Sequence, residues 1–451
     1  MDPIIAKHAN RRVPRYTSYP TAPHFAPDFP EATWREWLGA TPLDAPLSLY
    51  LHVPFCKKVC WYCGCNMKLA AREQPVRDYA GVLATEVDLL AGAMPGRMQV
   101  GHVHWGGGTP TAMPADCMAA VMTRLREAFA VRPDAEIAVE IDPRTLEDSM
   151  AAALGEMGFT RASLGVQEFD ADVQKTINRV QPYETVRRAV ENLRAAGVNA
   201  INFDLMYGLP RQTVESLAAT VERAVDLRPS RIALFGYAHV PWMAKNQRMI
   251  PEDTLPDLEA RFEQADEAAK ILVSHGYERL GLDHFALPSD PLTRAAHTGR
   301  MRRNFQGYTD DQSEHLLGLG ATSISQTPQG YAQNIVETGA WARAVKAGQL
   351  PVHRGRALIG DDRLRRDVIE RIMCDMEVDL PAQAFAHGET PDYFATEMEA
   401  LKPFVEDGLV EMRQGRVRVA DRGRPALRAI AAAFDAYLAQ GGGGARHAIA
   451  V

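Results

Sequence analysis

Residues 48–65 read SLYLHVPFCKKVCWYCGC, an apolar run that passes directly into a cluster of four cysteines. Cys56, Cys60 and Cys63 have the spacing Cys-x3-Cys-x2-Cys, and we expect them to share one loop at the end of a strand. Three thiolates on a short loop can occupy three corners of an iron–sulfur cube and leave the fourth iron open to another ligand. The stretch therefore predicts a [4Fe–4S] cluster held by these three cysteines.

Two other interpretations of the cysteines have to be weighed. A structural zinc site normally uses four ligands in two separated pairs, and the sequence offers no second pair. A redox pair formed by Cys60 and Cys63 would leave Cys56 without a role. The remaining two, Cys117 and Cys374, stand alone, whereas a disulfide framework would spread its cysteines along a small chain. The clustering therefore favours the iron–sulfur interpretation.

Short apolar runs alternate with amphipathic helical patterns from about residue 48 to residue 285. In the segment 183–197, for example, Val186, Val190 and Leu193 recur at helical spacing, and a second such stripe runs through 213–227. Six units of this kind predict a parallel α/β sheet with right-handed crossovers, open or closed into a partial barrel, with its active site at the carboxyl ends of the strands. The predicted strands are 48–55, 99–105, 136–141, 161–166, 200–207 and 231–237.

A chain of 451 residues is long enough for a large domain and a smaller one, and the alternation stops near residue 290. The C-terminal part has helical patterns at 361–377, 391–405 and 426–439 and a hairpin at 409–420, which together predict a winged-helix-like unit. We therefore expect an N-terminal segment 1–46, a main domain 47–290, a connecting region 291–360 that completes the active site, a C-terminal domain 361–440 and a flexible tail 441–451.

The charge and hydropathy of the chain limit its partners. The net charge is −7, and no run of about 18 apolar residues or signal peptide is present, so we expect a cytoplasmic protein that binds neither membranes nor nucleic acid. The hairpin region does carry arginines, which would suit a nucleic-acid module, but the acidic chain as a whole disfavours that function. These arginines are Arg413, Arg416, Arg418, Arg422, Arg424 and Arg428.

Five segments together resemble one known family. They are PRYTSYPT at 14–21, the stretch 48–65, HWGGGTPT at 104–111, NFQGYT at 304–309 and YAQN at 331–334. The resemblance, over about residues 13–438, is to the oxygen-independent coproporphyrinogen III oxidases of the radical S-adenosylmethionine (SAM) superfamily. It implies a six-stranded partial barrel of the radical SAM type with a mainly helical C-terminal domain.

The resemblance also implies a reaction. SAM would bind the open iron, and one electron would cleave it to methionine and a 5′-deoxyadenosyl radical. The radical would start the oxidative decarboxylation of two propionates of coproporphyrinogen III to vinyl groups, giving protoporphyrinogen IX in haem biosynthesis without molecular oxygen. A reducing partner such as flavodoxin or ferredoxin is implied, and we expect a monomer.

The resemblance further implies the site residues. Tyr50, Cys65 and Arg179 would act in catalysis, although Tyr50 could instead be a core residue and Arg179 a surface residue or a propionate ligand. Gln167, Arg179 and Asp204 would form a second SAM-like site that holds a second SAM or part of the substrate. The complete cofactor-binding set implied is Tyr50, Tyr62, Gly107, Gly108, Thr109, Glu140, Gln167, Arg179, Asp204, Ala238 and Ile324.

Two alternatives within this resemblance stay open. Haem chaperones share the three-cysteine motif and the barrel, but they typically lack the segment 14–21 and the fourth cysteine, Cys65. The segment 13–25 could cover the lateral opening of the barrel, with its tyrosines against a tetrapyrrole and Arg15 on a propionate. Alternatively, it could be a strap that packs on the exterior.

Overall fold

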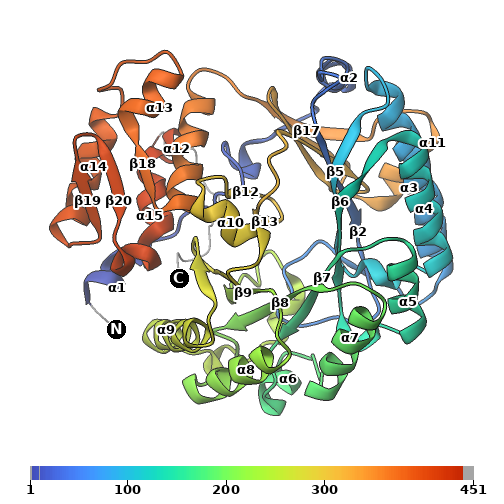
Figure 1. Ribbon diagram of the computed structural model, residues 1–451, viewed down its shortest axis with the longest axis horizontal. Coiled ribbons are helices and arrows are strands. Elements are labelled where there is room, and N and C mark those ends of the chain that lie inside the picture. The colour runs from blue at the N-terminus through green and yellow to red at the C-terminus, as the bar shows by residue number, and fades with distance from the viewer. Residues whose placement is uncertain (1–2, 10, 440–451) are drawn as a thin grey trace.

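Six parallel strands form the centre of the computed structural model, which describes residues 3–9 and 11–439 (Figure 1). They lie side by side in chain order, as the alternating pattern predicts. Leu51 and its neighbour His52, which point to opposite faces of the first of them, are both buried, as expected of a strand covered on both faces. The strands are β2 (Leu47–Val53), β5 (Gln99–Gly107), β6 (Ala130–Ile141), β7 (Arg161–Gln167), β8 (Ala200–Tyr207) and β9 (Arg231–Gly236).

Helices between these strands cover the outer face of the sheet (Figure 1). Their buried stripes are those predicted: Val186, Val190 and Leu193 are all buried. The second predicted helix starts at a capping box, in which Thr213 and Ser216 satisfy each other's backbone N–H groups. The helices are α3 (Gln74–Ala93), α4 (Ala115–Ala128), α5 (Asp148–Glu156), α6 (Ala171–Thr176), α7 (Tyr183–Ala195), α8 (Val214–Asp226) and α9 (Leu258–Ser274).

Strands that the sequence pattern did not predict extend the sheet on both sides, and most of them come from the region 291–360. Strand β14 pairs in parallel with β2, and β15, β16 and β17 follow in antiparallel order, while β11 and β10 extend the opposite side beyond β9. The sheet therefore ends in β1 and β10, and the barrel stays open. The added elements are β1 (Ala26–Pro27), β10 (Glu278–Leu280), β11 (His284–Ala286), α10 (Pro291–His297), β12 (Arg302–Asn304), β13 (Gly307–Thr309), β14 (His315–Leu319), β15 (Ile324–Thr327), β16 (Gly330–Asn334), α11 (Thr338–Lys346) and β17 (Val352–Ala357).

The C-terminal part follows the helix–strand–helix–helix–strand–strand order of a winged helix. The predicted hairpin is present as β19 and β20, and a short strand that we did not predict, β18, pairs with β20. The elements are α12 (Asp362–Asp375), β18 (Glu377–Asp379), α13 (Leu380–Ala386), α14 (Ala395–Glu406), β19 (Val410–Arg413) and β20 (Arg416–Val419). The predicted flexible tail at 441–451 lies outside the described residues.

The single helix predicted at 426–439 is wrong. The structure has α15 (Leu427–Ala431), a 3-10 turn and then α16 (Ala436–Ala439), with Asp435 in an extended conformation between them. The carboxylate of Asp435 accepts the backbone N–H groups of Tyr437 and Leu438, as a capping residue does at the start of a new helix. A strong local cap therefore divides the helix.

Several arginines of the C-terminal part are engaged within the protein. Arg416 donates to Glu377 and Asp379 at 2.7 and 3.1 Å. Arg428 is buried and donates to the carbonyls of Val13 and Pro14. Since these cations serve internal contacts, they give little support to a nucleic-acid module. In the part of the chain that the structure describes, no helix is both long and apolar enough to cross a membrane.

The N-terminal segment packs into the C-terminal unit. Tyr16 and Tyr19 are 4% and 1% exposed and belong to the same hydrophobic core as Val368 and Phe434. The Tyr16 hydroxyl donates to Asp435 at 3.0 Å. The expectation that these tyrosines lie against a tetrapyrrole is therefore wrong, because both rings are used to join the two ends of the chain.

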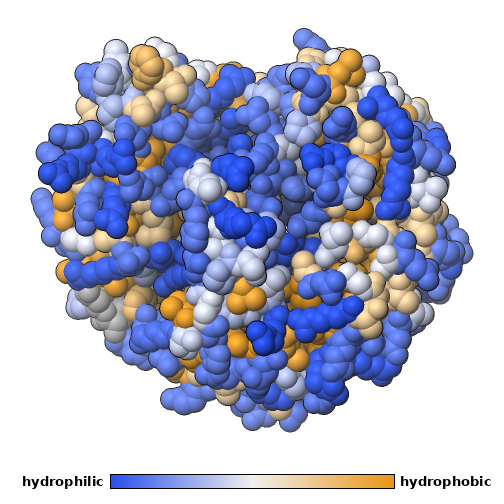
Figure 2. Space-filling model, viewed as in Figure 1, coloured by the Kyte–Doolittle hydropathy of each residue, from blue (hydrophilic) through white to orange (hydrophobic). Residues whose placement is uncertain are grey.

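The N-terminal helices α1 (Pro3–Ala9) and α2 (Glu31–Gly39) flank this segment. Helix α1 lies against the C-terminal unit, where His8 and Lys7 contact Asp407 at 2.6 and 2.8 Å. Figure 1 shows the C-terminal unit beside the open side of the barrel, and Figure 2 shows a hydrophilic hollow between the two lobes.

Candidate functional site

The four clustered cysteines follow β2 at the carboxyl edge of the sheet. The short strands β3 (Phe55–Cys56) and β4 (Lys68–Leu69) pair with each other and close the base of the cysteine loop. Cys60 is buried, Cys63 is half-buried and Cys65 is exposed. The loop therefore stands where the α/β architecture places an active site.

A segment far away in the sequence fastens this loop. The side-chain amide of Asn246 donates to the carbonyls of Cys60, Trp61 and Cys63 at 3.1, 3.2 and 2.8 Å. Its neighbour Gln247 donates to Tyr62 O at 2.7 Å and to the carbonyl of Ala238 at 3.1 Å. Neither amide was predicted, because no local motif marks a side chain whose hydrogen-bond partners in the loop lie more than 180 residues earlier in the chain.

The three thiols of the predicted cluster site each accept a hydrogen bond. Thr109 donates to Cys56 Sγ at 3.6 Å, and the backbone N–H of Cys65 donates to Cys63 Sγ at 3.4 Å. Arg144 and Arg179 donate to Cys60 Sγ at 3.1 and 3.2 Å. Such donors stabilise the thiolate form that binds iron.

Burial raises the pKa of Cys56 to about 11, whereas hydrogen bonding from Cys65 lowers the pKa of Cys63 to about 7. Among the described residues, no three His, Cys, Asp or Glu side chains are already spaced as a metal site. The donor set itself, three free thiols on one loop with N–H and O–H donors behind them, suits a thiolate-ligated cluster. We expect the thiols to converge as the cluster assembles.

The glycine loop after β5 packs directly against the cysteine loop. Gly107 has φ +112°, and a Cβ there would lie 2.6 Å from the His52 ring. A Cβ at Gly108 would lie 2.7 Å from the carbonyl of Phe55, and Thr109 N–H donates to that carbonyl at 2.7 Å. The glycines are thus required for close contact between these loops, in addition to the SAM contact that the resemblance implies.

Glu140, at the end of β6, joins the glycine loop to an aromatic pair. Its carboxylate accepts from Gly107 N–H at 3.0 Å and contacts His104 Nε2 at 3.2 Å. Burial would raise the pKa of Glu140, but His104 and the Gly107 N–H hold it below its ordinary value. The Tyr50 ring stacks on His104 with centroids 5.8 Å apart, and its hydroxyl contacts His52 Nδ1 at 3.1 Å. Tyr50 is half-buried at the edge of the site.

Arg179 is buried and lies behind the cysteine loop, so the interpretation as a surface arginine is wrong. Its guanidinium donates to the Gly165 carbonyl and Cys60 Sγ and lies 3.4 Å from Asp142 Oδ1. A Cβ at Gly165 would meet both Gln167 and Arg179, at 2.9 and 3.0 Å, so these two side chains converge. The guanidinium is occupied by this chain's own groups, which leaves less scope for a propionate there.

The remaining predicted residues lie along the same edge. Burial and the nearby Glu140 raise the pKa of Asp204 on β8 to about 7. Tyr62 lies beside Arg179, which opposes the rise that burial gives to its pKa. Ile324 on β15 is close to Tyr50, since Gly318 pairs with Tyr50 and a Cβ at Gly318 would lie 2.9 Å from Ile324 O.

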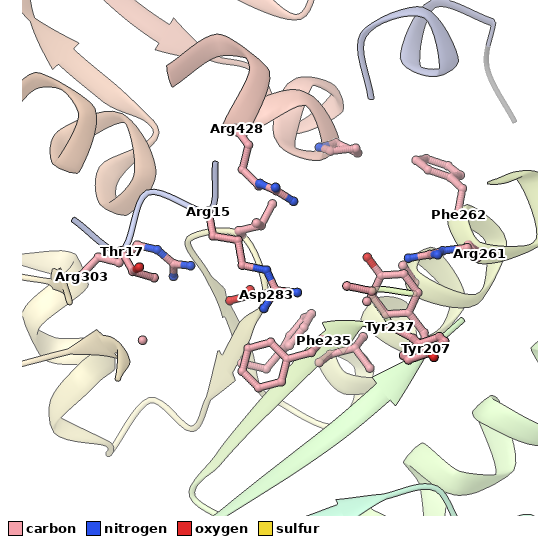
Figure 3. A pocket seen from close by; sticks show the side chains of 18 of the residues that line it. Arg15, Thr17, Tyr207, Phe235, Tyr237, Arg261, Phe262, Asp283, Arg303 and Arg428 are labelled. Carbon is pink, nitrogen blue, oxygen red and sulfur yellow. The ribbon is translucent and has the colours of Figure 1, made fainter. Parts of the chain in front are cut away.

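A cavity of about 380 Å³ lies between the carboxyl ends of β8 and β9 and the C-terminal unit (Figure 3). Ala238, a predicted SAM residue, is part of its lining. Arginines enter from the N-terminal segment, the barrel and the C-terminal unit: Arg12, Arg15, Arg261, Arg279, Arg303 and Arg428. Aromatic residues fill most of the apolar wall: Tyr207, Phe235, Tyr237, Trp242, Phe262, Phe285 and Phe305.

The cavity is strongly cationic. Its lining includes only two acids, Asp266 and Asp283, beside the six arginines. Burial, together with repulsion from the neighbouring Arg15 and Arg303, lowers the pKa of Arg428 to about 10. Cations crowded in a buried site are stabilised by an anionic ligand, so the cavity suits a molecule with apolar surface and several carboxylates. Of these arginines the sequence analysis proposed only Arg15 as a ligand, because the others come from distant elements.

Comparisons with known proteins identify the family. The family model of the Radical SAM superfamily matches residues 50–224. A relative in Bradyrhizobium diazoefficiens, named oxygen-independent coproporphyrinogen III oxidase, is 48% identical over 97% of each chain. A relative of the same name in Escherichia coli is 40% identical over 97% of this chain and 95% of the relative. The chain belongs to the oxygen-independent coproporphyrinogen III oxidase family, within the radical SAM superfamily.

A solved structure extends this likeness to the fold. Coproporphyrinogen III oxidase from Escherichia coli, described as a radical SAM enzyme, superposes with a TM-score of 0.90 at 37% identity. The superposition covers 95% of this chain and all of the other. The predicted fold class, a radical SAM α/β fold with a helical C-terminal part, is confirmed, as are the cofactors, a [4Fe–4S] cluster and SAM.

Proposed function

We propose that this protein converts coproporphyrinogen III to protoporphyrinogen IX without molecular oxygen. Two propionate side chains each lose one hydrogen atom, one electron and carbon dioxide and become vinyl groups. The observation that carries the proposal is the arginine-rich, aromatic cavity beside the cysteine loop. Coproporphyrinogen III is a tetrapyrrole with an apolar ring and four carboxylates, and the lining offers aromatic surface and several guanidinium groups to such a ligand.

The cofactors fit the residues at the carboxyl edge. We propose that Cys56, Cys60 and Cys63 hold the [4Fe–4S] cluster, which supplies the electron that cleaves SAM to a 5′-deoxyadenosyl radical. Asn246 and Gln247 hold the loop backbone in place, and the thiols receive hydrogen bonds from Thr109, Arg144 and Arg179. The chain thereby positions the reactive group and leaves its chemistry to the cofactor.

SAM would lie along the edge formed by β2, β5 and β6. The family resemblance assigns Tyr50, the glycine loop and Glu140 to it, and these groups contact one another. We propose that Gln167, Arg179 and Asp204 form the inner wall of a second SAM-like subsite. In that subsite Arg179 contacts Cys60 Sγ and Asp142. We therefore propose that it orients the cysteine loop and Asp142 rather than binding a propionate.

Several side chains would bind and shield the substrate. Arg15 and Thr17 of the N-terminal segment line the cavity from above, while Phe235 and Tyr237 form part of its floor (Figure 3). Because a radical intermediate must be kept from water, a cavity closed by the N-terminal segment and the C-terminal unit suits the reaction. Arginines entering from three directions can bind different propionates of one ring.

The haem chaperone is the competing function, and one experiment separates the two. Anaerobically reconstituted protein, SAM, a reductant and coproporphyrinogen III should yield protoporphyrinogen IX, identified by mass. A chaperone would retain haem stoichiometrically and return the porphyrinogen unchanged.

We further propose that the enzyme is a monomer and that a flavodoxin- or ferredoxin-like protein reduces it. We propose a cytoplasmic location because thiolate-ligated clusters need a reducing compartment.

A further inference from the structure

The cysteine loop separates two hollows. The arginine-rich cavity lies on one side and is linked to the loop through the segment 238–247. On the other side lies a groove of about 590 Å³ formed where α3, α4 and α5 begin, which we call the outer groove. The two hollows share no lining residue, and Figure 1 places these helices on the side of the barrel away from the C-terminal unit. The outer groove is therefore open to a second partner while substrate occupies the cavity.

The outer groove reaches the first predicted cluster ligand. Lys57, the neighbour of Cys56, lines it, and so does Thr111 in the turn after Thr109. Thr109 donates directly to Cys56 Sγ at 3.6 Å. In the pairing of β3 with β4, Cys56 lies opposite Leu69, whose side chain is 56% exposed. A molecule seated here would come within one residue of the Cys56 thiol.

The charge of the stretch 45–72, which carries the cysteine loop, is opposite to that of the whole protein. The chain has 57 acidic residues, yet residues 45–72 contain none. The same stretch carries four exposed cations around Leu69: Lys57, Lys58, Lys68 and Arg72. Acids border these cations: Glu73 and Glu147 line the groove, where Glu73 pairs with Arg77 and Glu147 lies 3.8 Å from Lys57, and Glu337 lies 3.5 Å from Lys68. Exposed pairs of this kind are weak and easily exchanged for an acidic partner.

We propose that the outer groove and Leu69 form the docking face for a small acidic electron-carrier protein. This inference rests on the proposed function, which consumes one reducing electron for each SAM cleaved. The carrier loses one electron and the cluster site gains it, with no bond formed or broken. Cations around an exposed apolar residue steer an acidic partner towards the cysteine loop.

A competing explanation is that the cations only offset the negative charge of the cluster. In that case charge reversal would change reduction by every reductant alike. The test therefore compares two reductants on reconstituted holoenzyme, flavodoxin hydroquinone as the acidic protein probe and dithionite as the small reductant. Loss of the visible absorption of the cluster is followed by stopped flow, and no porphyrinogen is present, so the result is independent of the decarboxylation.

The main variant is K57E/K58E, and the matched control is K402E on α14, where Lys402 is exposed and remote from the groove. We expect K57E/K58E to lower the flavodoxin rate constant about tenfold or more at low salt and to flatten its salt dependence. The dithionite rate should stay within about twofold of wild type, and K402E should match wild type with both.

A second variant, R72E, alters the lining of the groove from outside the cysteine loop, and it decides the question if K57E/K58E holds less iron. The same selective loss with flavodoxin is expected. Unchanged flavodoxin rates in these variants would overturn the proposal. An equal loss with flavodoxin and dithionite would also overturn it, because the cations would then act on the cluster and not on docking.

Discussion

The side-chain amide of Asn246 donates a 2.8 Å hydrogen bond to the main-chain carbonyl of Cys63, the last of the three predicted cluster ligands. The same nitrogen also reaches the carbonyl of Cys60 at 3.1 Å. One side chain from the loop after β9 therefore holds both ends of the turn that carries two of the thiols. A residue of the cysteine loop itself could not take over this role of Asn246.

Replacing Asn246 with Ala should loosen the cluster without unfolding the barrel. Leaving buried carbonyls unpaired costs about 1–3 kcal/mol, and here the cost falls on the loop. We expect N246A to lose iron to a chelator several-fold faster than wild type, with little change in melting temperature. N199A is the control, since the exposed Asn199 amide reaches only the Gly197 carbonyl at 3.2 Å. Identical iron-release rates in the two variants would show that Asn246 has no positioning role.

Serine substitutions should distinguish the three predicted ligands from the fourth cysteine of the loop. C56S, C60S and C63S should each fail to hold the cluster, as measured by iron and acid-labile sulfide after anaerobic reconstitution. C65S should retain it, because Cys65 hydrogen-bonds to Cys63 through both its side chain and its backbone N–H, and a serine hydroxyl can keep both contacts. C117S, on α4, serves as the control. Loss of iron in C65S would mean that the ligand assignment has to be changed.

Glu86 on α3 predicts a measurable pH dependence of stability. Burial raises its pKa from 4.5 to about 7, although Gly320 N–H, Asn334 and Trp341 donate to its carboxylate. The folded protein thus holds a proton that the unfolded chain releases near pH 4.5. The stabilisation is complete below that pH and is lost as the pH rises towards 7. Its size is at most about 3 kcal/mol, at about 1.4 kcal/mol for each pH unit.

The E86Q variant tests this contribution. Its free energy of unfolding should fall less steeply between pH 4.5 and 7 than that of wild type, measured by urea unfolding of the metal-free protein. E156Q changes an exposed acid at the end of α5 and should keep the wild-type slope. A wild-type slope in E86Q would show that Glu86 is ionised throughout this range.

Neighbouring residues of the N-terminal segment are predicted to have different roles, one in substrate binding and one in folding. Arg15 enters the cavity, whereas Tyr16 is part of the C-terminal core (Figure 3). R15A should therefore raise the KM for coproporphyrinogen III by about tenfold or more, the effect of losing a charge-assisted hydrogen bond. Iron content and SAM affinity should match wild type, and R35A, on the half-exposed face of α2, should change none of the three.

Deleting residues 1–24 is a poorer test of the same idea, because it would remove Tyr16 and Tyr19 from the C-terminal core and destabilise that unit. An unchanged KM in R15A would show that the segment is only a strap between the two ends of the chain.

The central strands were predictable because each is a continuous apolar run between helical stripes. All six lie within a few residues of the predicted bounds, apart from the start of β6, where the polar residues 132–134 extend the strand before its apolar part. Strands β14 and β18 were missed because they are short, and β18 is mostly charged (Glu377–Asp379). The break at Asp435 depends on a cap that only the folded backbone reveals.

The candidate site was predictable to the extent that motifs mark it. Cysteine spacing and the glycine loop identify the cluster side in one stretch of sequence. The substrate side could not be read in this way, since Arg261, Arg279, Arg303 and Arg428 come from α9, β10, β12 and α15 and meet only in the folded chain. The same holds for Asn246, whose partners lie more than 180 residues earlier.

The most direct test of the account is the product stoichiometry of an anaerobic reaction containing the reconstituted protein, a reductant, SAM and coproporphyrinogen III. One measurement by mass spectrometry would count protoporphyrinogen IX, 5′-deoxyadenosine and carbon dioxide together. The account predicts two 5′-deoxyadenosine and two carbon dioxide for each protoporphyrinogen IX formed. Recovery of unchanged coproporphyrinogen III, with or without SAM cleavage, would contradict it.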